Sequence, residues 1–309
     1  MLGPAILVIR GGAIGDFILT LPVLSALRQQ FPAARLEVLG YPRIASLAQE
    51  GALADAVSSI EARQLASFFA ARGALDPALQ DYFGRFAVII SYLYDPDHIF
   101  QTNVLASSKA QFIAGGHRPN EQGTMHATEF FLKPLEQLAI YDADTIPHLS
   151  LEPLADARSA MLAVHPGSGS EQKNWPEAAW VEFLDDIIAR TSWNVLIVGG
   201  EAEGARVSRL AGRWPRDRVS VAENLPLPLL ARQLKTCRGF IGHDSGITHL
   251  AAAVGVPALV LWGESNERIW APRGQTRILH GGPGLGHLTR GIVFEETCRL
   301  FTAEDHSGR

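Results

Sequence analysis

Small, acidic and hydroxyl-bearing residues that could bind phosphate gather in residues 240–253. A short apolar run there gives way to Asp244, Ser245 and Gly246, and an alanine-rich helical pattern follows. Backbone N–H groups at such a strand-to-helix junction attract anions, together with the positive end of the helix. We therefore expect Ser245 and the amides around Gly246 to face a phosphate, with His249 on the same helical face one turn later.

A second junction of this kind lies near the N-terminus, where apolar residues 5–9 lead into Gly12, Gly15 and Asp16. The glycine spacing is neither GxGxxG nor a Walker A motif, so by itself it is a weak signal for phosphate. Asp16 has two interpretations. It could cap the following helix by accepting backbone N–H bonds, or it could face an interdomain cleft as a general base for an acceptor hydroxyl. A base at a helix N-terminus is weak, which is tolerable when the leaving group is a diphosphate.

A glycine- and serine-containing loop follows the apolar residues 162–164 in the second half of the chain. Ser168, Gly169 and their amides could approach a diphosphate. Lys173 could offset the negative charge that grows as a sugar–phosphate bond breaks. A lone lysine in a loop is more often a solvated surface charge, so both interpretations of Lys173 stay open.

Glu201 follows another apolar run, residues 195–198. An acidic residue after a strand can accept hydrogen bonds from a ribose diol. The alternative is an acid in the first turn of the next helix, where the helix dipole favours it.

The histidine and cysteine spacing predicts no metal site. His165, His243 and His249 are scattered, HExxH is absent, and Cys237 and Cys298 form no CxxC pair. Two unpaired cysteines fit a reducing compartment.

Bulk composition indicates a globular protein of two domains. Of its residues, 47% are hydrophobic and 19% are charged. The length of 309 residues exceeds the size at which one hydrophobic core usually keeps growing. The net charge of −5 argues against broad nucleic-acid binding. No apolar run approaches the roughly 18 residues that span a bilayer, and no leader pattern opens the chain. We therefore expect a cytoplasmic protein with at most peripheral membrane contact.

Apolar runs alternate with helical patterns along both halves, which is the rhythm of parallel α/β sheets. The strands expected are residues 6–9, 36–39, 88–91, 162–165, 195–198, 219–221, 239–242 and 258–262. A stretch with proline and acidic residues near 145–160 separates the halves, and we place the domains at 1–152 and 153–309. In open α/β sheets ligands bind beyond the carboxyl ends of the strands, where all the candidate residues above fall.

Three motifs taken together resemble glycosyltransferase family 9, the bacterial ADP-heptose:lipopolysaccharide heptosyltransferases. Their order and spacing match over residues 6 to about 270. In this sequence they read Ile6-Leu7-Val8-Ile9-Arg10-x-Gly12-Ala13-Ile14-Gly15-Asp16, His165-Pro166-Gly167-Ser168-Gly169 with Lys173 and Trp175-Pro176, and Gly242-x-Asp244-Ser245-Gly246-x-x-His249-Leu250-Ala251-Ala252-Ala253.

The resemblance implies a GT-B fold, in which two Rossmann-like domains with parallel sheets face each other across a cleft. It implies an inverting, metal-independent transfer of a heptose or related sugar from an ADP-activated donor to a lipopolysaccharide core or similar glycan. The nucleotide sugar is then the substrate and no cofactor is needed. The partners are this donor and a glycolipid or oligosaccharide acceptor at the inner face of the bacterial inner membrane. The catalytic roles implied are Asp16 as base and Lys173 as cation. The donor site comprises Gly12, Gly15, Ser168, Gly169, Lys173, Glu201, Asp244, Ser245, Gly246 and His249.

The chain departs from the family pattern in three places. The family commonly has serine at Gly12, so a hydroxyl near the donor sugar is absent. Residues 92–129 hold Lys109 and Arg118 but no dense basic cluster for a phosphorylated acceptor. Residues 298–305 resemble the start of the family's terminal helix, and the chain ends four residues later. From this we expect less support for domain closure.

Three alternatives remain. Another GT-B enzyme, a hexosyltransferase or an epimerase that uses a UDP or GDP sugar, fits the same junctions. An NAD-dependent dehydrogenase would need GxGxxG and an acid about 20 residues later, and neither is present. A sugar-nucleotide-binding scaffold would need no base opposite the donor, so Asp16 and Lys173 together argue against it.

Overall fold

The computed structural model describes residues 4–154, 159–200 and 204–302, and the chain divides into two compact units. The first unit is Met1–His148 and the second is Leu149–Arg309. The sequence places the boundary after residue 152. In the structure the Leu149 N–H donates to the Ala253 carbonyl at 2.9 Å, and Lys235 Nζ donates to the Leu151 carbonyl at 2.7 Å. These bonds attach residues 149–151 to the second unit.

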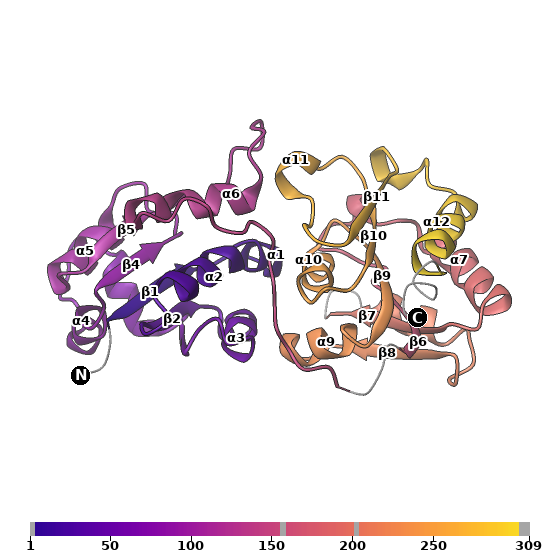
Figure 1. Cartoon of the computed structure of the whole chain (residues 1–309), viewed down its shortest axis with the longest axis horizontal. Helices are drawn as coiled ribbons and strands as arrows, with labels where there is room; N and C mark the ends of the chain where they lie inside the picture. Colours follow the sequence, from indigo (N-terminus) through magenta and orange to yellow (C-terminus); the bar gives the residue numbers. More distant parts are fainter. Residues whose placement is uncertain (1–3, 155–158, 201–203, 303–309) are drawn as a thin grey trace. The chain divides into compact units, whose positions relative to one another are not determined.

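The first unit is a parallel sheet of five strands in the order β3-β2-β1-β4-β5 among the described residues (Figure 1). Its strands are β1 (Ala5–Arg10), β2 (Arg35–Gly40), β3 (Ala56–Ser59), β4 (Val88–Ser91) and β5 (Gln111–Ala114). Its helices are α1 (Ile14–Ile18), α2 (Leu21–Gln30), α3 (Pro42–Glu50), α4 (Pro77–Gly84), α5 (Ile99–Ser107) and α6 (Ala127–Leu132), with 3₁₀ turns at Arg63–Phe69 and Lys133–Leu138. The central strands β1 and β4 are apolar and buried, which is why the sequence reveals them.

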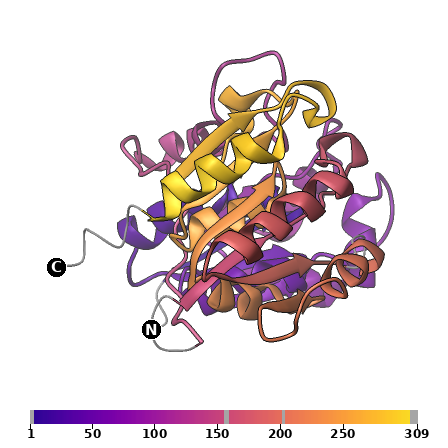
Figure 2. The same cartoon turned by 90° about the vertical axis from the view of Figure 1, so that its right-hand side faces the viewer.

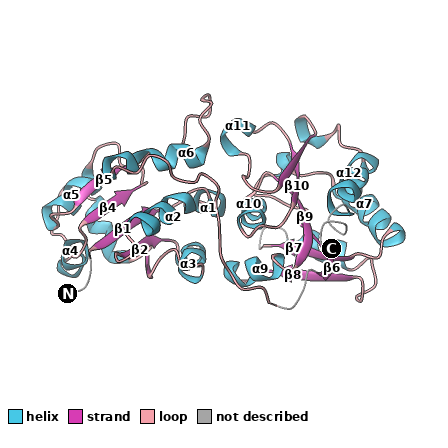
Figure 3. Ribbon diagram, viewed as in Figure 1, coloured by secondary structure: helices cyan, strands magenta, loops and turns pink. Residues whose placement is uncertain are grey.

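The second unit is a parallel sheet of six strands in the order β11-β10-β9-β6-β7-β8 among the described residues (Figure 3). Its strands are β6 (Ser159–Val164), β7 (Asn194–Gly199), β8 (Val219–Glu223), β9 (Cys237–His243), β10 (Ala258–Trp262) and β11 (Thr276–His280). Its helices are α7 (Glu177–Arg190), α8 (Gly204–Ala211), α9 (Leu227–Leu234), α10 (Gly246–Ala253), α11 (Glu267–Trp270) and α12 (Arg290–Thr302), with 3₁₀ turns at Glu171–Lys173 and Pro283–Leu285. This confirms the predicted class of two Rossmann-like α/β units of the GT-B type, each with a parallel sheet.

The C-terminal helix α12 belongs to the second unit. It lies beside α7 over one face of that sheet (Figure 2). Phe301 of α12 is buried against Gly239 of β9, where any Cβ would collide with the Phe301 ring. The Arg238 guanidinium donates to the Phe301 carbonyl at 2.7 Å. Glycine at position 239 therefore permits close packing between strand and helix.

Each sheet has one point where the strand order reverses. In the first unit it lies between β1 and β4, and in the second between β6 and β9. Loops that leave the carboxyl ends of strands at such a point form the usual ligand crevice of open α/β sheets. The loops with Asp16, Lys173 and Asp244 follow β1, β6 and β9 respectively.

Candidate functional site

Asp16 is held at the start of α1 by a backbone hydrogen bond. Ala13 is the N-cap residue, and Asp16 lies three residues further on. Its carboxylate Oδ2 accepts the Ala13 N–H at 2.9 Å. The carboxylate thus accepts a backbone N–H bond, but the interpretation of Asp16 as the N-cap residue is wrong: Ala13 is the N-cap, and Asp16 bonds back to it from the third helical position. The side chain is 31% exposed, so the carboxylate also reaches solvent.

The buried guanidinium of Arg10 also contacts the Asp16 carboxylate. Its side chain is 3% exposed, and Nη2 lies 3.5 Å from Asp16 Oδ1. Nη2 also donates to the Asp16 carbonyl at 3.3 Å, and Nη1 donates to the His117 carbonyl at 2.9 Å. The guanidinium stacks 4.3 Å from the Phe131 ring centroid. Burial lowers the pKa of Arg10 while the charge of Asp16 opposes that shift. In the sequence, Arg10 is recognisable only as an arginine at the end of an apolar run, and we predicted no role for it.

Gly12 is required by its backbone conformation. Its φ is +97°, and a Cβ there would lie 2.8 Å from Asp16 Oδ2. A serine in this conformation would press its Cβ on the Asp16 carboxylate, so the observed position of this carboxylate depends on glycine at position 12. Gly15 lies within α1, where its carbonyl accepts the Leu19 N–H at 2.9 Å.

Lys173 and Asp244 form an ion pair in the second unit. Lys173 Nζ lies 2.5 Å from Asp244 Oδ2. The lysine side chain is 42% exposed and the aspartate 11%. The pair joins the loop after β6 to the end of β9. Lys173 is thus paired with a carboxylate while part of its side chain stays exposed, and its role toward a donor remains a prediction.

His243 fastens the loop of residues 165–175 to β9. It is fully buried, and its Nε2 accepts the Trp175 N–H at 2.9 Å. A backbone N–H can only donate, so Nδ1 carries the proton and donates to the Gly167 carbonyl at 3.3 Å. Burial lowers the pKa of His243 to about 3. This neutral, structural histidine was missed as a site component because its role depends on tertiary contacts.

Ser245 is the N-cap of α10, and its Oγ accepts the Thr248 N–H at 3.4 Å. The hydroxyl also lies 3.4 Å from His165 Nδ1 and 3.1 Å from Thr248 Oγ1. Gly246 is the first residue of α10. His249 is in the same helix, as predicted, and is buried with 5% exposure. The junction thus has the predicted strand-to-helix form.

Ser168 and Gly169 lie in the loop after β6 without the same steric requirement. Ser168 Oγ donates to the Ser170 carbonyl at 2.9 Å. A Cβ at Gly169 would meet no atom within 4 Å. The loop is held from α8 by Arg206, which donates to the Pro166 carbonyl at 3.3 Å and to both Glu171 carboxylate oxygens at 2.8 and 2.9 Å. Glu201 lies outside the described residues.

Two further observations concern ligands and membranes. Across the described ranges, no group of three or more His, Cys, Asp or Glu side chains is arranged to hold a metal ion. Within the same ranges, no helix combines the length and apolar character required to cross a bilayer. The absence of a cofactor and of a metal remains a prediction.

Known proteins provide three comparisons. The family model described as glycosyltransferase family 9 (heptosyltransferase) matches residues 124–289. The chain is 34% identical to lipopolysaccharide heptosyltransferase 1 of Pseudomonas aeruginosa over 133 residues, which are 42% of this chain but only 37% of that relative. It is 25% identical to lipopolysaccharide heptosyltransferase 3 of Escherichia coli over 84% of this chain and 83% of that protein.

The fold also resembles that of ADP-heptose lps heptosyltransferase II of Escherichia coli. The TM-score is 0.78, with 97% of this chain and 99% of that chain covered, at 15% identity. The match to the family model includes Lys173, Asp244 and Ser245 and extends over more than half of the sequence. This chain belongs to glycosyltransferase family 9, the heptosyltransferase family.

Proposed function

We propose that this protein transfers a heptose, or a related sugar, from an ADP-activated donor to a hydroxyl of a lipopolysaccharide core or similar glycan. The observation that carries the proposal is the cluster of Lys173, Asp244 and Ser245 at the strand reversal of the second unit. All three residues fall within the stretch that matches the family model. A lysine and a helix N-terminus that share one edge of a sheet suit a diphosphate.

In this proposal the second unit holds the donor. Lys173 and the Ser245 hydroxyl contact the diphosphate, with the amides of residues 167–169. Asp244 pairs with Lys173 in this structure. When the donor phosphates bind Lys173 instead, the Asp244 carboxylate accepts a hydrogen bond from a hydroxyl of the donor sugar. Gly246 allows the anion to approach closely, and His249 supports the junction between β9 and α10. Glu201 accepts hydrogen bonds from the ribose hydroxyls. The name of the Escherichia coli relative, which includes ADP-heptose, favours ADP as the nucleotide.

The first unit supplies the base. The Asp16 carboxylate takes the proton of the acceptor hydroxyl while that oxygen attacks the anomeric carbon. The bond between this carbon and the diphosphate oxygen breaks, and its electron pair leaves with ADP. Lys173 offsets the charge that grows on the leaving group. Direct displacement inverts the anomeric centre and requires no metal or other cofactor. We propose a cytoplasmic enzyme with peripheral membrane contact and a glycolipid or oligosaccharide acceptor.

A transfer assay tests the proposal and separates it from its nearest alternative. Purified protein is given ADP-heptose, UDP-glucose or GDP-mannose with a heptose-free lipopolysaccharide core, and the glycan mass is measured. A mass increase of one heptose from the ADP donor alone is the expected result. Transfer from the UDP or GDP donor, or isomerisation of either sugar without transfer, would replace the heptose assignment with a hexosyltransferase or an epimerase.

A further inference from the structure

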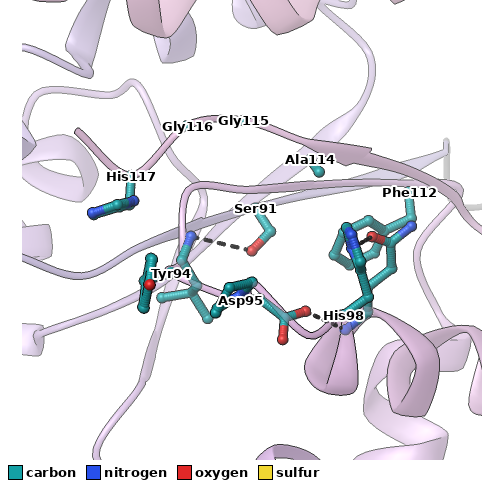
Figure 4. Close-up of a pocket in the computed structure, with 12 residues that line it drawn as sticks. Ser91, Tyr94, Asp95, His98, Phe112, Ala114, Gly115, Gly116 and His117 are labelled. Atoms are coloured by element: carbon teal, nitrogen blue, oxygen red, sulfur yellow. Dashed lines mark hydrogen bonds between the residues drawn. The ribbon is translucent and has the colours of Figure 1, made fainter. Parts of the chain in front are cut away.

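A pocket of about 190 Å³ opens at the carboxyl ends of β4 and β5 in the first unit (Figure 4). Twelve described residues line it. Tyr94 and His117 lie at one end, and His98 lies beside Phe112 at the other (Figure 4). The pocket therefore occupies the ligand-binding edge of this sheet, next to the strand reversal at β1.

The pocket presents an aromatic ring and several uncharged polar groups. The Tyr94 ring is 70% exposed, and its centroid lies 4.7 Å from that of His117 in an edge-to-face contact. An exposed aromatic ring combines an apolar face with a polar hydroxyl. At the other end, His98 Nδ1 lies 3.1 Å from Gln101 Oε1. A flat ring among hydrogen-bonding groups fits the C–H face and hydroxyls of a sugar.

The electrostatics of the pocket disfavour an anion. Among its twelve described lining residues, none is lysine or arginine, and Asp95 contributes a carboxylate. That carboxylate accepts the N–H groups of Phe100 and Gln101, at 3.1 and 2.9 Å. Arg118, the residue after His117, is bound to Glu121 at 2.6 Å. A carboxylated or phosphorylated sugar would meet the Asp95 carboxylate here and neither a lysine nor an arginine among the lining residues.

The walls of the pocket are pre-formed. A Cβ at Gly115 would collide with the Tyr92 ring, and a Cβ at Gly116 would collide with the Phe130 ring. His98 is held at φ 54°, a conformation that non-glycine residues rarely adopt. Both walls thus depend on specific backbone positions, so the pocket does not arise from loosely packed side chains.

The pocket shares its wall with the Asp16 loop. The carbonyl of His117 accepts from Arg10 Nη1, while Nη2 of the same guanidinium lies against the Asp16 carboxylate. Leu93 of the pocket lies 3.8 Å from the point where a Gly11 Cβ would be. One buried arginine therefore ties the position of the pocket to that of the proposed base.

We propose that this pocket binds an uncharged sugar ring of the acceptor, with Tyr94 as the stacking surface, and that it selects against acidic or phosphorylated sugars. The acceptor role rests on the proposed transferase function. Binding of a neutral sugar to this pocket does not depend on the transferase function. Tyr94 is then the residue that restricts this part of the acceptor to uncharged sugars.

The test compares two probes that differ in charge. Methyl β-glucoside and methyl β-glucuronide have the same pyranose ring and differ only at C6, where the glucuronide carries a carboxylate. All five tyrosines lie in the first unit, so NMR of protein with ¹³C-labelled tyrosine reports on this unit, and the signal lost in Tyr94→Phe assigns Tyr94. We expect the glucoside, or its galacto or manno analogue, to shift the Tyr94 signal and to bind about tenfold more tightly than the glucuronide.

Two substitutions at one position separate stacking from the hydroxyl. Tyr94→Ala should weaken glucoside binding about fivefold, and Tyr94→Phe should change it by less than about twofold. Tyr94 is mostly exposed, so both variants should keep the melting temperature of the wild type. Equal or tighter binding of the glucuronide, no binding of any neutral glycoside, or an unchanged Kd in Tyr94→Ala would overturn the proposal.

A parallel titration with ADP distinguishes failure of this proposal from failure of the transferase function. Tyr94→Ala should bind ADP as the wild type does. If ADP binds but the pocket prefers the glucuronide, the acceptor assignment is wrong and the transferase remains. If Tyr94-dependent glucoside binding occurs without ADP binding, the pocket stands and the proposed function is wrong.

Discussion

The strand reversals of the two units have the same topology and opposite charge. In the first unit the exposed group is the Asp16 carboxylate, held by a backbone N–H and by a buried guanidinium. In the second unit it is the Lys173 ammonium, paired with Asp244 beside the N-terminus of α10. One fold thus presents a carboxylate at the strand reversal of one unit and an ammonium group at that of the other.

The two loops are also held in different ways. The first has a backbone conformation that only Gly12 readily adopts, and it is held by charge. The second has little steric requirement at Gly169 and is held by the neutral imidazole of His243. A buried guanidinium fixes the Asp16 carboxylate in the first loop, whereas the second loop is held by His243 and by the Arg206–Glu171 pair, and its Lys173 pairs with Asp244.

The largest effect is expected from Asp16→Asn. The amide keeps the size of the side chain but cannot take the acceptor proton, so turnover should fall about 10²- to 10⁴-fold. The rate of ADP release from ADP-heptose in the presence of acceptor measures this. ADP affinity, which belongs to the second unit, should stay the same. Turnover within a fewfold of wild type would reduce Asp16 to a helix-capping residue.

His243 should make the second unit sensitive to acid. Its pKa is about 3 in the fold and about 6.5 in an unfolded chain. The unfolded state therefore binds the proton first as the pH falls. The stability supplied by the neutral imidazole is complete above pH 6.5 and declines by about 1.4 kcal/mol per pH unit towards pH 3.

All six tryptophans lie in the second unit, so their fluorescence reports its unfolding alone. Urea titrations between pH 7 and 4 should show a shallower pH dependence in His243→Asn than in wild type. His148→Ala is the control, because the His148 side chain is 63% exposed and its removal should leave the slope as it was. An unaltered slope in His243→Asn would contradict a buried neutral imidazole.

Gly12→Ala and Gly169→Ala compare the two loops directly. An alanine at position 12 would have to adopt the positive φ of Gly12, and its methyl group would press on Asp16 Oδ2, so the variant should lose about 1–3 kcal/mol of stability and most of its turnover. The same change at Gly169 meets open space and should cost less than about 0.5 kcal/mol. Chemical denaturation followed by circular dichroism gives both values. Equal costs would mean that the loops do not differ in constraint.

Lys173→Ala should have a small effect on folding and a selective effect on donor binding. An ion pair with a 42% exposed lysine contributes at most about 1 kcal/mol to stability, while loss of a cation from a diphosphate site should weaken ADP binding about tenfold. Calorimetric melting and nucleotide titration measure the two. A destabilised variant with unchanged ADP affinity would make the pair structural.

The sequence predicted the central strands and the two junctions, because buried parallel strands are continuous apolar runs followed by glycine and polar residues. The missed strands β3, β5 and β11 lie at sheet edges and are partly exposed. Their apolar runs are at most three residues long, as in Ala56–Ser59 and Thr276–His280, where only two consecutive residues are apolar. After β1 the chain forms two successive helices, α1 and α2, and Pro22 lies in the first turn of α2.

The candidate residues were predictable by type, and their partners were not. Asp16, Lys173 and Ser245 stand directly after strands, where chemistry is expected. Arg10 and His243 act through groups 107 and 76 residues distant in sequence, His117 and Gly167. Such contacts depend on the order of strands in the sheet, which a single sequence does not reveal.

The most direct test of a donor site in the second unit is isothermal titration with ADP, UDP and GDP. We predict selective binding of ADP, with a Kd about tenfold or more below those of UDP and GDP; Asp16→Asn should keep this affinity and Lys173→Ala should weaken it. A preference for UDP or GDP, or ADP binding that Lys173→Ala leaves unchanged, would contradict the assignment of an ADP-sugar site around the Lys173–Asp244 pair.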